Sequence, residues 1–204
     1  MRRSLETLEP LVTTRTDTLR ESTCAAHARI EAALPLMNPS LTRETYLGLL
    51  EGFFGFHAPL ESGLLGVVLA HDPVFAADDR RKMPLLLADL HALGRTSAEL
   101  SALPLCTDLP CVTSPSQALG ALYVLEGATL GAQIIVRHVR ETLALGPTTG
   151  AAFFSGYGKR TGSMWKRFCS HVNASPLLDT EVVVGAAVET FEKLLAWFAQ
   201  PPAR

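Results

Sequence analysis

Apolar residues recur at helical spacing along nearly the whole chain, and no segment shows the strict apolar–polar alternation of a half-buried strand. Prolines, glycines and capping residues divide this pattern into segments. Pro35 should end the first segment, whereas Gly55 and Pro59 should only bend the second. The pattern predicts helices over 17–34, 41–71, 78–94, 115–145, 161–173 and 179–199, with a short turn at 96–101.

Several of these helices carry recognisable start and stop signals. The sequence Ser-Pro-Ser-Gln at 114–117 offers an N-cap serine, a proline at the first helical position and a capping-box glutamine. That helix should end at the Gly-Pro pair at 146–147. The Asp pair at 78–79 and Asp179 should each begin a helix. The sequence therefore predicts an all-α, single-domain fold of six to eight helices.

Composition and charge narrow the class of protein. With 204 residues, 48% of them apolar and 19% charged, the chain can bury a sizeable core. We expect residues 1–16, which are polar, to form a flexible arm, and residues 17–200 to form the domain. A net charge of −2 without a basic run argues against nucleic acid binding. The sequence has no uninterrupted apolar stretch long enough to span a membrane, so we expect a soluble, cytoplasmic protein.

Two kinds of metal site are disfavoured by spacing. The four cysteines form no Cys-x-x-Cys pair, which removes the usual signature of zinc, redox dithiol and c-type haem sites. A carboxylate-bridged di-iron centre needs Glu-x-x-His on two helices, and no histidine here has a glutamate three residues before it.

One histidine lies on a helical face that suits a planar ligand. Arg20, Thr23 and Glu31 each fall within about 40° of His27 on a helical wheel. Arg20 lies roughly 10 Å along the axis from His27, so it can meet acidic groups of a ligand centred near the imidazole. Glu31, one turn later, can receive the second imidazole N–H, as metal-binding histidines usually require.

The most apolar predicted helix has two glycines one turn apart. Each of Gly127 and Gly131 costs the helix about 1 kcal/mol relative to alanine. Both lie on one face, and Ala128, Thr129 and Ala132 beside them are also small. Two interpretations remain open: close packing against a bulky neighbouring helix, or contact with a flat ligand.

At these residues the chain resembles bacterial haem oxygenases. "ALGALYVLEGATLGAQII" resembles their distal helix, with its Tyr-Val-x-Glu-Gly-x-x-Leu-Gly pattern, and "LRESTCAAHARIEAAL" resembles the proximal helix that carries the iron-binding histidine. "YLGLLEGFFGFHAPLE", "RRKMPLLLADLHALG", "FFSGYGKRTGSMWKRF" and "AAVETFEKLLAWF" are similar to further helices of the family, in the same order. The resemblance covers almost the whole chain. It implies a fold with haem between a proximal and a kinked distal helix.

The resemblance also implies roles for the residues around the proximal helix. His27 would be the iron ligand, with Thr23 and Glu31 beside it. Arg20 would pair with a haem propionate, and the Tyr123 hydroxyl would bind a propionate as well.

On the distal side, Gly127, Ala128, Gly131 and Ala132 would form the wall over the haem. Mammalian and cyanobacterial members have an aspartate directly after the first distal glycine, where this chain has Ala128. Protons would therefore be handled through water, and His57, predicted to face inward, is our candidate for a remote group that holds such water.

The implied reaction is the oxidative opening of haem b to biliverdin, carbon monoxide and Fe²⁺, with haem as both cofactor and substrate. It requires O2 and an external electron donor, either a ferredoxin or an NADPH-dependent reductase. Arg167 belongs to a basic face around Trp165 that can reach a propionate or the donor. Similarity to phytochrome-associated members suggests a bacteriophytochrome as the biliverdin acceptor.

Three other readings stay open on the sequence alone. A haem carrier or sensor of the same fold would bind haem without opening it. A helical enzyme acting on a small organic molecule, such as a thiaminase-like protein, would need neither His27 nor Arg20. A purely structural helical module would leave the glycine face unexplained.

Overall fold

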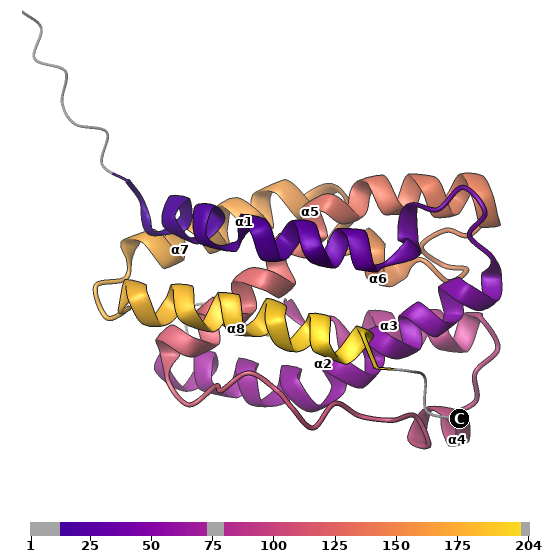
Figure 1. The fold of residues 1–204 in the computed structure, drawn as a ribbon, viewed down its shortest axis with the longest axis horizontal. Helices are drawn as coiled ribbons and strands as arrows, with labels where there is room; N and C mark the ends of the chain where they lie inside the picture. The colour runs from indigo at the N-terminus through magenta and orange to yellow at the C-terminus, as the bar shows by residue number, and fades with distance from the viewer. Residues whose placement is uncertain (1–12, 73–79, 201–204) are drawn as a thin grey trace, which may run out of the picture.

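The computed structural model describes residues 13–72 and 80–200, and it assigns helices and no strand to them. The all-α prediction is confirmed. Figure 1 shows the long helices running side by side along the long axis of the molecule, with shorter helices between them. In chain order the helices are α1 (Arg15–Ala33), η1 (Pro35–Met37), α2 (Arg43–His71), α3 (Met83–Ala92), α4 (Ser97–Ser101), α5 (Pro115–Leu143), α6 (Ala152–Ser155), η3 (Gly158–Arg160), α7 (Thr161–Ala174) and α8 (Thr180–Phe198).

The predicted capping residues begin the two helices as expected. Ser114 accepts the N–H of Gln117, whose side chain returns to the Ser114 backbone, so the capping box of α5 is complete. The Asp179 carboxylate accepts two backbone N–H groups at the start of α8. The predicted end of α5 is slightly late, because Ala144 adopts a left-handed conformation (φ 55°) and stops the helix after Leu143.

Three predicted helix starts differ from the structure by two residues or more, and one of them is α2, which begins at Arg43 rather than 41. The first helix begins at Arg15 rather than 17, with Thr14 as its N-cap, and the Arg15 guanidinium donates to backbone carbonyls of α7 and the turn after it. Residues 15 and 16 of the predicted arm therefore belong to α1, and residues 1–12 lie outside the described residues. The helix expected from 78 begins at Met83, while the Asp pair at 78–79 also lies outside them.

Gly55 and Pro59 are absorbed within one continuous helix, α2. Pro59 has no N–H to donate to the carbonyl of Gly55 four residues earlier. That carbonyl accepts the N–H of Cys106 instead, at 2.9 Å. Gly55 also lies so close to the loop at 103–113 that an added Cβ would be 2.6 Å from the Pro104 carbonyl oxygen. The pair therefore lets the loop at 103–113 lie against α2.

The core is organised around α5. This helix packs mainly on α8, and α1 packs along the same helix α8. Buried side chains form two clusters, one where α1, α5, α7 and α8 meet α2, and one where α2, α3 and α6 meet the second half of α5. Since α5 contributes to both, its position depends on nearly every other helix. α1 and α5 themselves share few contacts.

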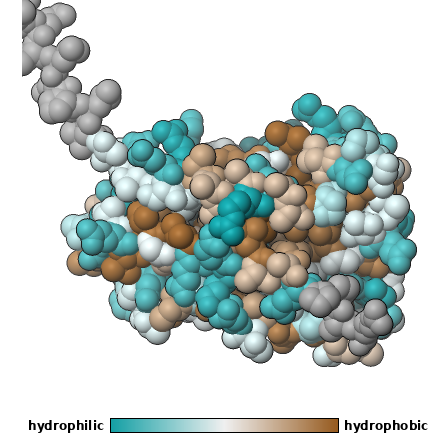
Figure 2. All heavy atoms as spheres, in the orientation of Figure 1, coloured by the Kyte–Doolittle hydropathy of each residue, from teal (hydrophilic) through white to brown (hydrophobic). Residues whose placement is uncertain are grey.

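By length and composition alone, α2 and α5 are each long and apolar enough to cross a membrane. In both, however, 56% of the most apolar window is buried inside the protein, as in core helices of globular proteins. Figure 2 shows brown apolar atoms on one face of the molecule interspersed with teal hydrophilic ones, rather than a continuous apolar belt.

Candidate functional site

Of the predicted proximal residues, His27 and Glu31 lie on the outer face of α1. The His27 side chain is 48% exposed, and its Nδ1 lies 3.7 Å from a carboxylate oxygen of Glu31. The edge of the imidazole packs against the Phe191 ring, with 5.8 Å between the ring centroids. Glu31 thus lies on the Nδ1 side of the ring, which leaves Nε2 for a ligand.

The structure brings three predicted residues of two helices together. Tyr123 of α5 lies beside Thr23 of α1, and Arg20 is near enough to act on the Tyr123 hydroxyl electrostatically. Burial raises the pKa of Tyr123, and these two neighbours oppose the shift. Thr23 is buried and donates to the Leu19 carbonyl, while the Arg20 side chain is 80% exposed. The Thr23 proton is therefore already used, and this corner offers the Tyr123 hydroxyl and the Arg20 guanidinium to an acidic group.

The two distal glycines are not required by the packing of the chain. A Cβ at Gly127 would make ordinary contacts with the Trp165 ring, at 3.7 Å, and a Cβ at Gly131 would meet no atom of the described residues within 4 Å. In the same helix, a Cβ on Gly120 would collide with the Val183 carbonyl oxygen and lie 2.8 Å from the Ala186 Cβ. Close helix packing therefore explains Gly120 but neither of the other two. α5 continues as a helix through both distal glycines.

The residues around these glycines leave an apolar surface uncovered. Leu130 is 41% exposed and Ile134 is 64% exposed, although both belong to an otherwise core-forming helix. Ala128 is exposed as well, and Ala132 is buried. A flat apolar ligand would cover such a surface, whereas water leaves it solvated at a cost.

His57 is buried in α2 among aromatic rings. The ring centroids of Phe53, Phe56 and Phe153 lie 6.4, 6.3 and 5.4 Å from that of the imidazole. Its Nδ1 has no hydrogen-bond partner among the described residues. Burial, with the charge of Lys82 as a second cause, lowers the pKa of His57 to about 3. The imidazole is therefore neutral and lacks the partner that a buried nitrogen normally has.

Arg167 lies on an exposed basic face. With Lys159, Arg160 and Lys166 it belongs to η3 and α7, and all four side chains are exposed. Trp165, directly before Lys166 in α7, places its ring beside Gly127. The basic face therefore adjoins the distal helix.

One group of polar residues at this helix was missed by the sequence analysis. Glu126, directly before Gly127, is fully buried and binds the side chains of Arg80, Lys82 and Tyr157. The available signal was that Glu126 is the only charged residue between 115 and 136. Its partners lie far away in the chain, so no local pattern identifies them.

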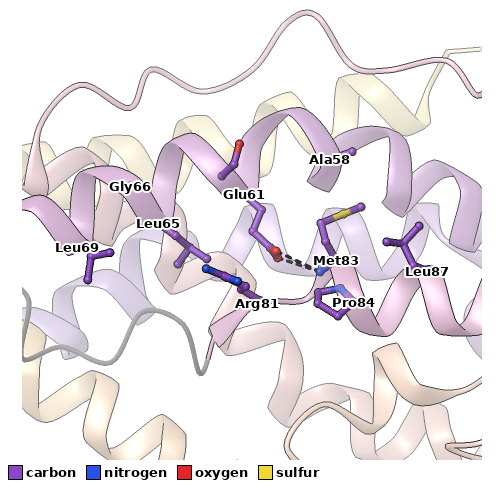
Figure 3. A pocket seen from close by; sticks show the side chains of 10 residues that line it. Ala58, Glu61, Leu65, Gly66, Leu69, Arg81, Met83, Pro84 and Leu87 are labelled. Carbon is purple, nitrogen blue, oxygen red and sulfur yellow. Dashed lines mark hydrogen bonds between the residues drawn. The ribbon is translucent and has the colours of Figure 1, made fainter. Parts of the chain in front are cut away.

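A separate pocket of about 390 Å³ lies between α2 and α3 and contains none of the predicted site residues. In Figure 3 the Glu61 side chain points from α2 toward the start of α3, and it accepts the backbone N–H groups of Lys82 and Met83. These bonds cap α3, which explains why this helix begins at Met83. The polar contacts of this pocket thus serve the fold.

The side chains at this site suit an iron that is already bound within a porphyrin ring. Within residues 13–72 and 80–200, no three His, Cys, Asp or Glu side chains gather in a way that could hold a metal ion. A single exposed imidazole, a hydroxyl-and-arginine corner and an uncovered apolar helix face are the groups that haem needs from a protein.

Comparisons with known proteins identify the fold and the family of the chain, not its individual site residues. The family model described as heme oxygenase matches residues 13–200. The structure of the heme oxygenase of Leptospira interrogans is similar, with 20% identity, a TM-score of 0.74, and coverage of 91% of this chain and 98% of that one. Heme oxygenase 2 of Chlamydomonas reinhardtii, solved without heme, shares 18% identity with a TM-score of 0.67, and the match covers 93% of this chain and 99% of that one. The NO- and CO-bound heme oxygenase of Neisseria meningitidis shares 22% identity with a TM-score of 0.59, and the match covers 94% of this chain and 96% of that one. A comparison with curated proteins finds no significant match. Since the family model spans nearly the whole described chain, the protein belongs to the haem oxygenase family.

Proposed function

We propose that this haem oxygenase binds haem b between α1 and α5 and opens it to biliverdin, carbon monoxide and Fe²⁺. The observation that carries the proposal is the contrast within α5: Gly120 is required by helix packing, whereas Gly127 and Gly131 are not. A helix that gives up about 2 kcal/mol for two glycines that no neighbouring element requires is adapted to a ligand rather than to its own core.

On the proximal side, His27 would hold the haem iron through Nε2. Glu31 would accept the Nδ1 proton, directly or through a water, which fixes the ring tautomer and orientation. The edge of Phe191 restricts the rotation of the imidazole. Because His27 is exposed, the ligand would reach it without any rearrangement of the core.

The corner of Arg20, Thr23 and Tyr123 would bind a haem propionate. It offers the Arg20 guanidinium and the Tyr123 hydroxyl at the junction of α1 and α5, with Thr23 beside them. Charge-assisted hydrogen bonds of this type fix orientation as well as affinity. Arg167, on the neighbouring α7, would serve a propionate or a docking partner.

On the distal side, the backbone at Gly127 and Gly131 would approach the ligand closely, with Ala128 and Ala132 adding no bulk. Bound haem supplies the iron that activates O2 and is itself the molecule oxidised. The chain has no acid or base at positions 127–134, so water would move the protons. The unpartnered Nδ1 of His57 supports a water in that region, because a buried neutral imidazole is most stable with a hydrogen-bond partner.

The exposed basic face of η3 and α7 would receive the electron donor, a ferredoxin or an NADPH-dependent reductase. Four exposed cations attract an acidic protein surface, and Trp165 connects this face to the distal helix. We further propose that the reaction takes place in the cytoplasm, with a bacteriophytochrome as the acceptor of biliverdin.

The test compares His27→Ala with His91→Ala, both of which remove an exposed histidine. Haemin is added to each protein and the Soret band is recorded, first without oxygen and then in air with ascorbate or a ferredoxin system. The wild type and His91→Ala should form biliverdin, while His27→Ala should show an altered Soret band and no turnover. Full turnover by His27→Ala would refute the proximal assignment. Haem binding without biliverdin in the wild type would identify a carrier or sensor instead.

A further inference from the structure

A buried cluster of charges holds α5 one residue before its first distal glycine. One carboxylate oxygen of Glu126 accepts from Lys82 Nζ at 2.8 Å and from the Tyr157 hydroxyl at 2.6 Å, and the other pairs with the Arg80 guanidinium. The Lys82 ammonium also lies 2.5 Å from the Tyr157 hydroxyl and 4.0 Å from the centre of its ring. Three segments of the chain thus meet at one side chain.

The cluster is unusually well removed from water. Glu126 is 0% exposed, and Arg80 and Lys82 are each 2% exposed. Burial lowers the pKa of Lys82 and raises that of Tyr157, and the Glu126 carboxylate opposes the first shift and adds to the second. A buried ion pair of this kind contributes little net stability compared with apolar side chains, but removing one partner leaves an uncompensated charge. Its retention in the core calls for an explanation other than stability.

The turn that carries Tyr157 is built to direct it inward. Gly156 and Gly158 on either side have positive φ angles of 51° and 57°, which non-glycine residues rarely adopt. Gly156 also packs against Thr129 of α5, where an added Cβ would lie 3.6 Å from the threonine side chain. The 156–158 turn therefore touches α5 at two points, one before and one between the distal glycines.

Helical geometry relates this cluster to the distal face. At about 100° per residue, Gly127 and Gly131 lie roughly 100° and 140° around the helix from Glu126. The charges therefore pull on the side of α5 away from the ligand. A rotation or outward shift of the helix at the glycines would break the bonds to Glu126, since its partners come from other segments.

We propose that Glu126 is a positioning residue, whose bonds to Arg80, Lys82 and Tyr157 fix the rotation and depth of α5 at Gly127 and Gly131 and thereby select the meso carbon that is attacked. The inference rests on the proposed function for its second half, the choice of meso carbon. The first half, the restraint of the distal helix, concerns the chain alone and is measurable without haem.

Two variants weaken the cluster to different degrees. Glu126→Gln keeps the shape and removes the charge, while Tyr157→Phe removes only one hydroxyl and leaves every charge in place. Glu51→Gln is the matched control. Glu51 forms an ion pair with Arg95 outside the Glu126 cluster, and the side chains of Glu51 and Arg95 are 20% and 34% exposed.

The first readout is hydrogen exchange of the haem-free proteins, followed by mass spectrometry of peptides covering 122–136 and α8. We expect amides 127–131 to exchange at least tenfold faster in Glu126→Gln and severalfold faster in Tyr157→Phe, with α8 unchanged in both. Glu51→Gln should match the wild type. Unchanged exchange at 127–131 in both variants overturns the proposal. A second result also overturns it: α8 and α5 both exchange faster in Glu126→Gln, while α5 exchanges at the wild-type rate in Tyr157→Phe. In that case the cluster serves only the general stability of the protein.

The second readout is the ratio of biliverdin isomers after turnover, separated by chromatography. The ratio of the major to the minor isomers should fall at least threefold in Glu126→Gln, with haem affinity within threefold of the wild type. An unchanged ratio overturns the link to the meso carbon. If the wild type forms no biliverdin, the proposed function fails, whereas the exchange result still decides whether Glu126 restrains α5.

Discussion

Replacing His57 should remove a large pH dependence of stability. The imidazole is 4% exposed, is enclosed by phenylalanine rings, and has its pKa lowered to about 3 by burial and by the charge of Lys82. In the unfolded chain the pKa returns to about 6.5. The substitution His57→Leu keeps the site apolar and similar in volume but abolishes the titration.

The sign and size follow from proton linkage. Between pH 6.5 and 3 the unfolded chain binds a proton at His57 that the folded chain excludes, so the free energy of unfolding falls as the pH falls. The slope approaches about 1.4 kcal/mol per pH unit, which amounts to about 2.5 kcal/mol between pH 7 and pH 4.5. Carboxylates titrate in the same range, but they are shared by the wild type and the variant, and their contribution cancels in the difference.

The assay is denaturant unfolding of the haem-free protein at pH 7 and pH 4.5. The wild type should lose about 2.5 kcal/mol more than His57→Leu between the two pH values. Phe56→Leu, which alters a neighbouring buried side chain without a titrating group, should lose stability equally at both. Equal pH dependence of the wild type and His57→Leu would refute the conclusion that a neutral imidazole is enclosed in the core.

Two glycine substitutions in α5 should have opposite effects. Gly131→Ala should stabilise the haem-free protein by about 1 kcal/mol, because the new methyl group meets no atom of the described residues within 4 Å and alanine favours the helix. The same substitution should weaken haem binding. Equal stability and an unchanged haem affinity in titrations would contradict this prediction. Gly120→Ala should destabilise by about 1–3 kcal/mol in thermal unfolding, because its methyl group would collide with α8, and a stability equal to wild type would show that the two helices can separate freely.

The sequence predicted helix positions well wherever the determinants are local. The capping box at 114–117 and the Asp179 cap act within one turn, so the start of α5 and α8 could be located from a few letters. The start of α3 could not. Its first N–H groups are capped by Glu61, about twenty residues away on α2, and only the folded chain brings the two together.

The candidate site shows the same limit. A helical wheel placed Arg20, Thr23 and His27 on one face of α1, and the structure keeps them there, but the approach of Tyr123 to Thr23 depends on how α1 and α5 pack on α8. The lone Nδ1 of His57 was equally out of reach, since sequence indicated an inward-facing histidine without showing whether a carbonyl would satisfy it.

Glycines in one helix illustrate why a fold was easier to predict than a site. In the sequence, Gly120, Gly127 and Gly131 are alike: each interrupts an apolar helix at the same cost in helix propensity. What separates them is the presence or absence of a neighbour, and only the packed structure shows that α8 occupies the space beside Gly120 while the space beside Gly131 is free. Glu126 completes the contrast, because the helix that leaves one side open to a ligand is held on another side by buried charges. A distal helix with bare backbone needs such a restraint from outside its ligand face, since glycines themselves provide no side chain to hold it in place.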